Sequence, residues 1–149
     1  MYLLDTNAVS LLGPARNRTP TENRIADWLK SSSSELYLSV ITVSEIETGI
    51  SRLIRTGASA KAAIFKDWLD LVVELYGARI HSLDLESARL AGRLFDKAVG
   101  KGGNPGFSDA AIAAIAQTRA LTVMTRNVAH FSLFEAACIN PYEVLPGGA

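Results

Sequence analysis

The sequence lacks the features that would tie the chain to a secreted or membrane setting. Its 149 residues include one cysteine, Cys138, so no disulfide can form within the chain. Uncharged stretches such as Leu36 to Ser44 are about half of the roughly 18 residues that indicate a membrane span. Asp5 and Asn7 lie where a signal peptide needs basic residues and then an apolar run. These absences predict a cytoplasmic protein with no membrane segment.

Net charge is also absent, because 15 Lys and Arg residues balance 15 Asp and Glu residues. Proteins that bind nucleic acid through its phosphates usually carry a basic excess, since neutralising phosphates releases counterions and supplies much of the affinity. Composition alone therefore argues against a nucleic-acid-binding protein.

The sequence does contain enough apolar material for a core, at 48% hydrophobic residues, and its length favours a single domain over residues 1–149. Short apolar runs alternate with longer segments of helical period. The runs expected to be strands are residues 1–4, 36–41, 79–83, 121–124 and 137–139. Such alternation predicts an α/β fold in which helices cover both faces of a parallel sheet.

Several helices have recognisable ends. Thr19 and Glu22 flank Pro20 in a pattern that predicts a capping box at a helix start. Thr42 and Glu45 have the same spacing and predict a second capping box. Further helices are expected over about 59–76, from 84 through 95, and from 108 or 109 through 116, with a glycine-rich loop at 100–106 before the last.

Three acidic residues fall at the same edge of the predicted sheet. Asp5 follows the first strand, Glu45 follows the second, and Asp109 begins the helix before the fourth. Each alone has an ordinary structural explanation as a cap or a partner of the helix dipole. Together, like charges raise each other's pKa unless a cation compensates them. Carboxylates without neighbouring His or Cys ligands favour Mg2+ or Mn2+ over zinc.

Other chemistries fit the residues less well. An aspartyl-phosphate enzyme needs a second acid two residues after its nucleophile, where this chain has Asn7. The loop at 100–106 lacks the G-K-[ST] of a phosphate-binding loop and follows a helix. His81 lies within a strand and is interpreted as structural. His130 lies at the active edge, but no Ser or Cys nucleophile in a recognisable elbow accompanies it, which disfavours a catalytic triad.

Four segments in order resemble the motifs of the PIN-domain ribonucleases, specifically the VapC and FitB branch of toxins from toxin-antitoxin systems. The segments are residues 3–7, 39–49, 109–114 and 125–131, and residues 139–142 resemble the common chain ending. The resemblance covers nearly the whole chain. It implies a PIN-like three-layer α/β/α fold with a central, mostly parallel five-stranded sheet.

The resemblance also implies a metal-dependent endoribonuclease toxin that hydrolyses RNA phosphodiester bonds. Asp5, Glu45 and Asp109 would hold Mg2+, with Mn2+ as a substitute, so that the metal activates water and stabilises charge on the phosphate. Asn127 occupies a fourth catalytic position where some relatives carry an acid. An amide brings no charge, so the sequence leaves open whether one or two metals bind.

Hydroxyl side chains lie beside these motifs. The resemblance assigns Thr6, Ser44 and Thr125 to orienting carboxylates or water around the metal. It further implies a homodimer, a larger toxin-antitoxin assembly, and a cognate antitoxin protein that pushes a side chain, often Arg, into the acidic pocket. The RNA that is cleaved and the class of antitoxin stay open.

The charge balance reads differently if a divalent cation neutralises three acids, because the rest of the surface then keeps a slight positive balance. Candidates for a basic rim that contacts RNA are Arg16, Arg18, Lys97, Lys101 and Arg126. The alternative to the nuclease is a catalytically impaired PIN scaffold that acts as a protein- or RNA-binding module, and Asn127 is its main support.

Overall fold

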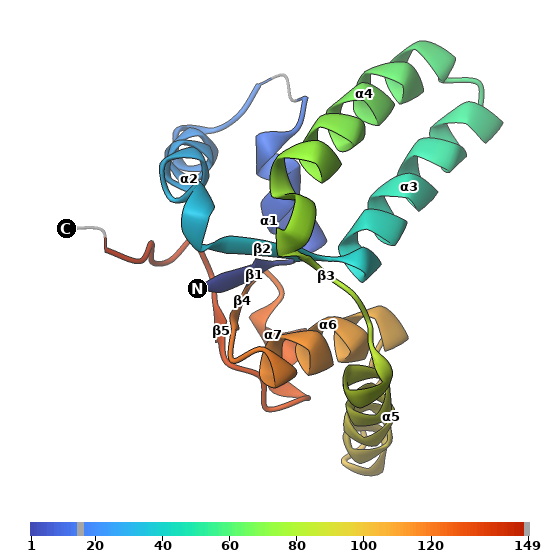
Figure 1. Ribbon diagram of the computed structural model, residues 1–149, viewed down its shortest axis with the longest axis vertical. Coiled ribbons are helices and arrows are strands. Elements are labelled where there is room, and N and C mark those ends of the chain that lie inside the picture. Colours follow the sequence, from blue (N-terminus) through green and yellow to red (C-terminus); the bar gives the residue numbers. More distant parts are fainter. Residues whose placement is uncertain (15–16, 148–149) are drawn as a thin grey trace.

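The computed structural model describes residues 1–14 and 17–147, and in these residues strands and helices alternate along the chain (Figure 1). The strands form one five-stranded sheet in the order β3-β2-β1-β4-β5, and all neighbouring strands are parallel. The strands are β1 (Tyr2–Leu4), β2 (Leu36–Ser39), β3 (Ile80–His81), β4 (Thr122–Met124) and β5 (Cys138–Ile139). The predicted parallel sheet is confirmed, with strands shorter than the apolar runs that contain them.

The helices account for most of the described residues. They are α1 (Thr6–Val9), α2 (Pro20–Ser31), α3 (Val40–Arg55), α4 (Ser59–Tyr76), α5 (Leu85–Gly100), α6 (Phe107–Thr118) and α7 (Val128–Ser132). Three short 3-10 turns join them to their neighbours: η1 (Ser10–Leu12), η2 (Ser33–Glu35) and η3 (Gly77–Arg79). None of the described helices is both long and apolar enough to cross a membrane.

The helices form two layers on opposite faces of the sheet, with α1 to α4 on one face and α5 to α7 on the other (Figure 1). Successive side chains of a strand point to opposite faces, so Leu3 and Leu4 of the central strand enter different cores. Leu4 packs with α1 to α4, and Leu3 packs with α6 and α7. The three-layer α/β/α architecture that the resemblance implied is confirmed.

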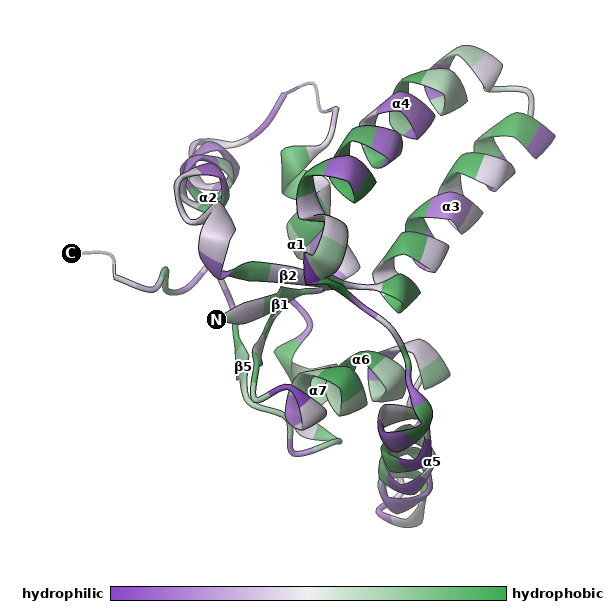
Figure 2. Ribbon diagram, viewed as in Figure 1, coloured by the Kyte–Doolittle hydropathy of each residue, from purple (hydrophilic) through white to green (hydrophobic). Residues whose placement is uncertain are grey.

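Helix α6 is the most deeply buried helix of the second layer. Every residue from Ala110 to Ala116 is buried, and the hydrophobic colour of this stretch stands out in Figure 2. Five of these seven residues are alanines, and the other two are Ile112 and Ile115. Small side chains let α6 lie close to the sheet and to α5. This close packing fixes the position of the N-terminus of α6, where Asp109 lies.

The two predicted capping boxes have different outcomes. At α2, Glu22 N donates to Thr19 Oγ1 at 3.2 Å and Thr19 N donates to Glu22 Oε2 at 2.9 Å, so the first box is confirmed. The second is wrong, because α3 begins at Val40 and its cap is Ser39, whose hydroxyl accepts from Thr42 N at 3.2 Å. Strand β2 pairs with β3 up to Ser39, and the chain turns into the helix at once. Glu45 is therefore one turn inside α3, and its carboxylate has no capping role.

The short helices α1 and α7 have no counterpart among the expected helices. An isolated helix of four or five residues is unstable in water, because nucleation is unfavourable and few hydrogen bonds repay it. Both helices are held by tertiary contacts: Val9 of α1 and Phe131 of α7 are fully buried. They matter for function, because α1 follows Asp5 directly and α7 carries His130.

Candidate active site

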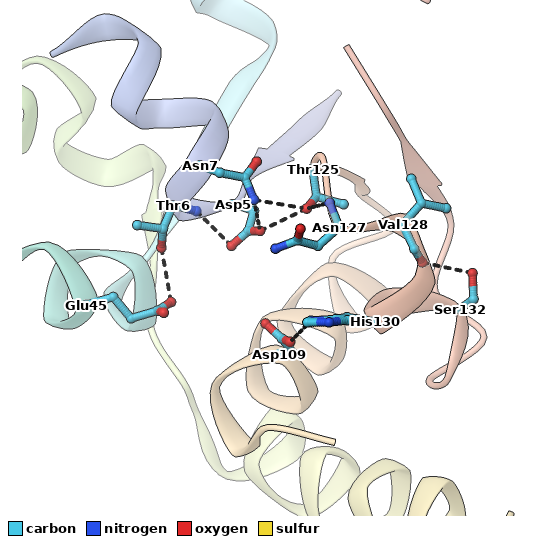
Figure 3. Close-up of polar contacts among 10 residues, drawn as sticks. All are labelled: Asp5, Thr6, Asn7, Glu45, Asp109, Thr125, Asn127, Val128, His130 and Ser132. Carbon is cyan, nitrogen blue, oxygen red and sulfur yellow. Dashed lines mark hydrogen bonds and ion pairs between the residues drawn. The ribbon is translucent and has the colours of Figure 1, made fainter. Parts of the chain in front are cut away.

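The three predicted acids lie around one space at the carboxyl ends of the central strands (Figure 3). Asp5 is the residue after β1, Glu45 lies in α3 after β2, and Asp109 lies in the first turn of α6. The negative charge of Asp109 raises the pKa of Asp5, and the charges of Asp5 and Asp109 both raise the pKa of Glu45. The fold thus brings together three like charges from distant parts of the sequence.

Asp5 is the buried member of the cluster, with 5% of its surface exposed. Its Oδ1 accepts a hydrogen bond from Thr6 N at 2.7 Å, and its Oδ2 accepts from Asn7 Nδ2 and Thr125 Oγ1, both at 2.9 Å. These three donors stabilise the ionised form, but burial has the larger effect and raises the pKa of Asp5 above its ordinary value. The donors also fix the orientation of the carboxylate.

Thr6 links two of the acids. Its backbone N–H donates to Asp5, and its hydroxyl donates to Glu45 Oε1 at 3.0 Å. Partial burial raises the pKa of the Glu45 carboxyl, and the hydrogen bond from Thr6 opposes that rise. A single residue of α1 therefore sets the positions of the carboxylates of Asp5 and Glu45 relative to each other.

Asp109 contacts His130, which the sequence interpretation did not include among the site residues. His130 Nδ1 lies 3.1 Å from Asp109 Oδ2, and the His130 side chain is 62% exposed (Figure 3). The sequence signal was its position three residues after Asn127 at the active edge. The sequence position alone does not identify the partner of His130, which is known only because α7 places the imidazole ring beside the first turn of α6.

Asn7 is a second residue that the sequence interpretation considered only as a missing acid. Its Nδ2 donates to Asp5, while its Oδ1 accepts a hydrogen bond from Arg126 N at 3.0 Å. Asn7 thereby ties α1 to the chain that follows β4. Its spacing two residues after Asp5, on the first turn of a helix that follows a strand, was the available signal.

The remaining predicted site residues have different surroundings. Thr125 donates to Asp5 and accepts from Asn127 N at 2.9 Å, so it holds both residues. The Asn127 side chain points toward Asp5 in Figure 3. Ser44 is exposed and lines a polar groove beside Glu45, and within the described residues its hydroxyl has no hydrogen bond to a carboxylate.

The donor set fits a hard divalent cation that keeps part of its water shell. Among the described residues, neither Asp5 nor Glu45 forms an ion pair with a Lys or Arg, so their charge is uncompensated. Within residues 1–14 and 17–147, no three His, Cys, Asp or Glu side chains lie close enough together to hold one ion directly. Mg2+ takes one or two carboxylates and several waters, so it does not need three carboxylates in direct contact.

The family comparison agrees with the site and the fold. The PIN domain family matches residues 2–133 of the chain. The chain belongs to the PIN-domain family. This assignment confirms the resemblance read from the four sequence motifs.

Individual relatives match this PIN domain over nearly its whole length. Toxin FitB of Neisseria gonorrhoeae is 33% identical over 143 residues, which cover 95% of the chain and 99% of FitB. A VapC ribonuclease of Sinorhizobium fredii is 31% identical over 145 residues, or 96% of the chain and 99% of the relative. The crystal structure of FitAcB from Neisseria gonorrhoeae superposes with a TM-score of 0.81 at 31% identity, covering 97% of the chain and 100% of that chain.

Two grooves of the PIN domain meet at Glu45. The first has a volume of about 350 Å³ and lies between α1, α3 and α4, where Ile46, Ile50, Phe65 and Trp68 give it an apolar wall. The second has a volume of about 390 Å³ and runs from α3 to the start of α6, past Ser44 and Ser108. Glu45 is thus accessible from an apolar and from a polar side.

The residues proposed as a basic rim are mostly engaged elsewhere. Lys97 and Lys101 both pair with Glu135, at 3.0 and 2.9 Å, and lower the pKa of that carboxyl to about 2. Arg18 donates to the carbonyl of Gly13. Arg126 lies instead over the ring of Tyr142. Arg16 lies outside the described residues.

Proposed function

We propose that this PIN domain is a metal-dependent endoribonuclease and the toxin of a toxin-antitoxin pair. The observation that carries the proposal is the cluster of Asp5, Glu45 and Asp109, whose mutual repulsion no Lys or Arg of the described residues compensates. Support comes from relatives that are 31–33% identical over nearly the full length and are named as Toxin FitB and a VapC ribonuclease.

Asp5, Glu45 and Asp109 would hold Mg2+ or, as a substitute, Mn2+, in part through bound water. When bound, such a cation supplies positive charge that stabilises the negative charge developing on a phosphate during hydrolysis. Its charge would also favour the ionised form of carboxyl groups whose pKa values are raised without it.

The protein's own contribution is to hold the carboxylates in place before substrate arrives. Asp5 receives hydrogen bonds from Thr6, Asn7 and Thr125, so its oxygens need not reorganise during the reaction. Asn127 places a neutral amide beside Asp5, where it can hydrogen-bond water or a phosphate oxygen. His130 orients Asp109 through the hydrogen bond between its Nδ1 and Asp109 Oδ2.

The nuclease activity is tested with protein purified free of any partner and incubated with structured RNAs in Mg2+, Mn2+ or EDTA. We expect cleavage with either metal, no cleavage in EDTA, and loss of cleavage in Asp5→Asn and Asp109→Asn. Asp67→Asn, an exposed acid of α4, is the matched control and should retain activity. Full activity in EDTA would contradict the metal-dependent mechanism. Specific RNA binding without cleavage would favour the impaired scaffold instead.

The antitoxin is proposed to occupy the apolar groove between α1, α3 and α4. Phe65 and Trp68 offer aromatic surface there, and Glu45 lines the same groove and adds a carboxylate. A peptide with apolar side chains and one Arg fits both features, because the guanidinium would pair with the acids in place of a cation. An antitoxin bound in this way would block the metal site.

A homodimer is proposed through the other stripe of α4. Ile64, Leu71 and Leu75 are 55%, 52% and 64% exposed, and large apolar side chains exposed together on one helix are typical of an interaction surface. Light scattering should report a dimer for the wild type and a monomer for Leu75→Glu, whereas a dimeric Leu75→Glu would place the interface elsewhere.

We also propose that residues 1–149 form one domain, since both core clusters pack on the same sheet.

A further inference from the structure

Arg126 and Tyr142 form a cation–π pair beside the acidic cluster. The Arg126 guanidinium carbon lies 4.8 Å from the centroid of the Tyr142 ring. Arg126 stands in the sequence between Thr125, which contacts Asp5, and Asn127. The pair therefore combines a cation and an aromatic ring at the edge of the proposed active site.

The position of the pair is fixed relative to Asp5. Arg126 N donates to Asn7 Oδ1 at 3.0 Å, and Asn7 Nδ2 donates to Asp5 Oδ2. On the other side, Tyr142 N donates to Asn140 Oδ1 at 3.1 Å, which holds the backbone of the tyrosine in a turn after β5. One side-chain amide thus joins the backbone of Arg126 to the catalytic carboxylate.

The guanidinium of Arg126 is available to a ligand. Arg126 is exposed, and within the part of the chain that the structure describes it forms no ion pair. The neighbouring Glu22 carboxylate is occupied by its capping box with Thr19 and accepts from Tyr142 Oη at 3.4 Å. By contrast, Lys97 and Lys101 are held by Glu135.

We propose that Arg126, held over the ring of Tyr142, binds a backbone phosphate of single-stranded RNA next to the phosphate that is cleaved. This inference rests on the proposed ribonuclease function. A guanidinium offers a planar fork of N–H donors that matches two phosphate oxygens, and stacking on a ring restricts its conformations before the ligand arrives. The neutral net charge of the chain is compatible with such a site, because one fixed cation beside the reaction centre positions RNA without a broad basic surface.

The test measures RNA binding separately from cleavage. Fluorescence anisotropy of a fluorescein-labelled single-stranded RNA is recorded in EDTA, and a gel confirms that the RNA stays intact. We expect Arg126→Ala to raise Kd roughly tenfold, as for a lost charge-assisted hydrogen bond. The slope of log affinity against log salt should fall by about 0.7, the value for one phosphate contact on a single strand. Arg126→Lys keeps the charge and should give a smaller increase in Kd.

Two further variants separate the ring from the charge. Tyr142→Phe keeps the stacking surface and should bind as the wild type does, whereas Tyr142→Leu should weaken binding in the direction of Arg126→Ala. Arg93→Ala removes one exposed positive charge from α5 and should leave Kd and the salt slope unchanged. Thermal unfolding checks that each variant is folded.

Cleavage kinetics give an independent readout. In Mg2+, Arg126→Ala should raise KM while kcat stays close to that of the wild type, because Arg126 contacts neither the acids nor the reacting phosphate. Equal Kd and equal salt slope for Arg126→Ala and wild type would overturn the inference even if the wild type cleaves RNA. Absence of metal-dependent cleavage in a wild type that binds RNA through Arg126 would overturn the proposed nuclease function and leave the binding site standing.

Discussion

Thr125 Oγ1 donates a hydrogen bond to Asp5 Oδ2 at 2.9 Å, although the two residues are 120 positions apart in the chain. The same hydroxyl oxygen accepts from Asn127 N, and Thr125 is completely buried. This hydroxyl has structural as well as catalytic consequences, because its loss removes one of the three hydrogen bonds to the buried Asp5 carboxylate and the partner of the Asn127 N–H.

Replacing Thr125 by Val should therefore destabilise the protein. We expect the free energy of unfolding to fall by about 1.5–3 kcal/mol, the contribution of a hydrogen bond to a charged group. Urea denaturation measures this change. Thr48→Val is the matched control, because the Thr48 hydroxyl is exposed and donates only to the carbonyl of Ser44 within α3. Equal loss of stability in the two variants would show that the contact with Asp5 has no special weight.

The raised pKa values of Asp5 and Glu45 predict how stability depends on pH. A carboxyl group with a higher pKa in the folded state binds more protons when folded, so stability falls as pH rises through the interval between the two values. This interval starts at the ordinary values of 3.8 for Asp5 and 4.5 for Glu45 and extends upward. In EDTA, Glu45→Gln should gain stability relative to the wild type as the pH rises above about 4.5.

Melting temperatures of both proteins across this pH range measure the effect. Glu135 affects stability in the opposite direction, because its pKa is lowered to about 2. The stability that its ionised form contributes is lost as the pH falls through the interval below 4.5. Both proteins retain Glu135, so the difference between them isolates Glu45. Glu47→Gln removes a carboxylate from the exposed face of the same helix and should show no such gain. Parallel curves for Glu45→Gln and wild type would contradict the prediction.

Divalent metal should stabilise the folded protein, because the cluster exists only in the folded state. At a metal concentration 100 times Kd the gain in the free energy of unfolding is about 2.7 kcal/mol. Mn2+ should raise the melting temperature of the wild type more than that of Asp109→Asn. Asp96→Asn, which removes an exposed acid from α5, should respond as the wild type does. Equal shifts in wild type and Asp109→Asn would count against a site that includes Asp109.

Binding of the antitoxin should depend on the aromatic wall of the apolar groove. The partner to use is the protein encoded by the adjacent reading frame, measured by calorimetry. Trp68→Ala should weaken binding by at least about 2 kcal/mol, as for a central aromatic contact. Lys66→Ala, which removes an exposed residue of α4 that pairs with Asp70, should change affinity little. If Trp68→Ala binds as tightly as the wild type, the antitoxin lies elsewhere.

The sequence by itself determined the elements that local chemistry specifies. Apolar runs located all five described strands, because strands covered on both faces need continuous hydrophobic residues. The capping box of Thr19 and Glu22 located the start of α2, since cap and acid act within one turn. The positions of Asp5, Glu45 and Asp109 at the strand ends followed from the parallel topology that this alternation predicts.

Only the tertiary structure decided what surrounds those acids. The sheet order places β1 between β2 and β4, so residues after β1 meet residues after β4. This adjacency creates the contacts of Asp5 with Thr125 and of Asn7 with Arg126, and no local pattern encodes either. Ser39 replaced Thr42 as the cap of α3 for the same reason, because strand pairing determines where the chain leaves the sheet. Residue types fix which groups are available, whereas the order of the strands fixes which of them meet.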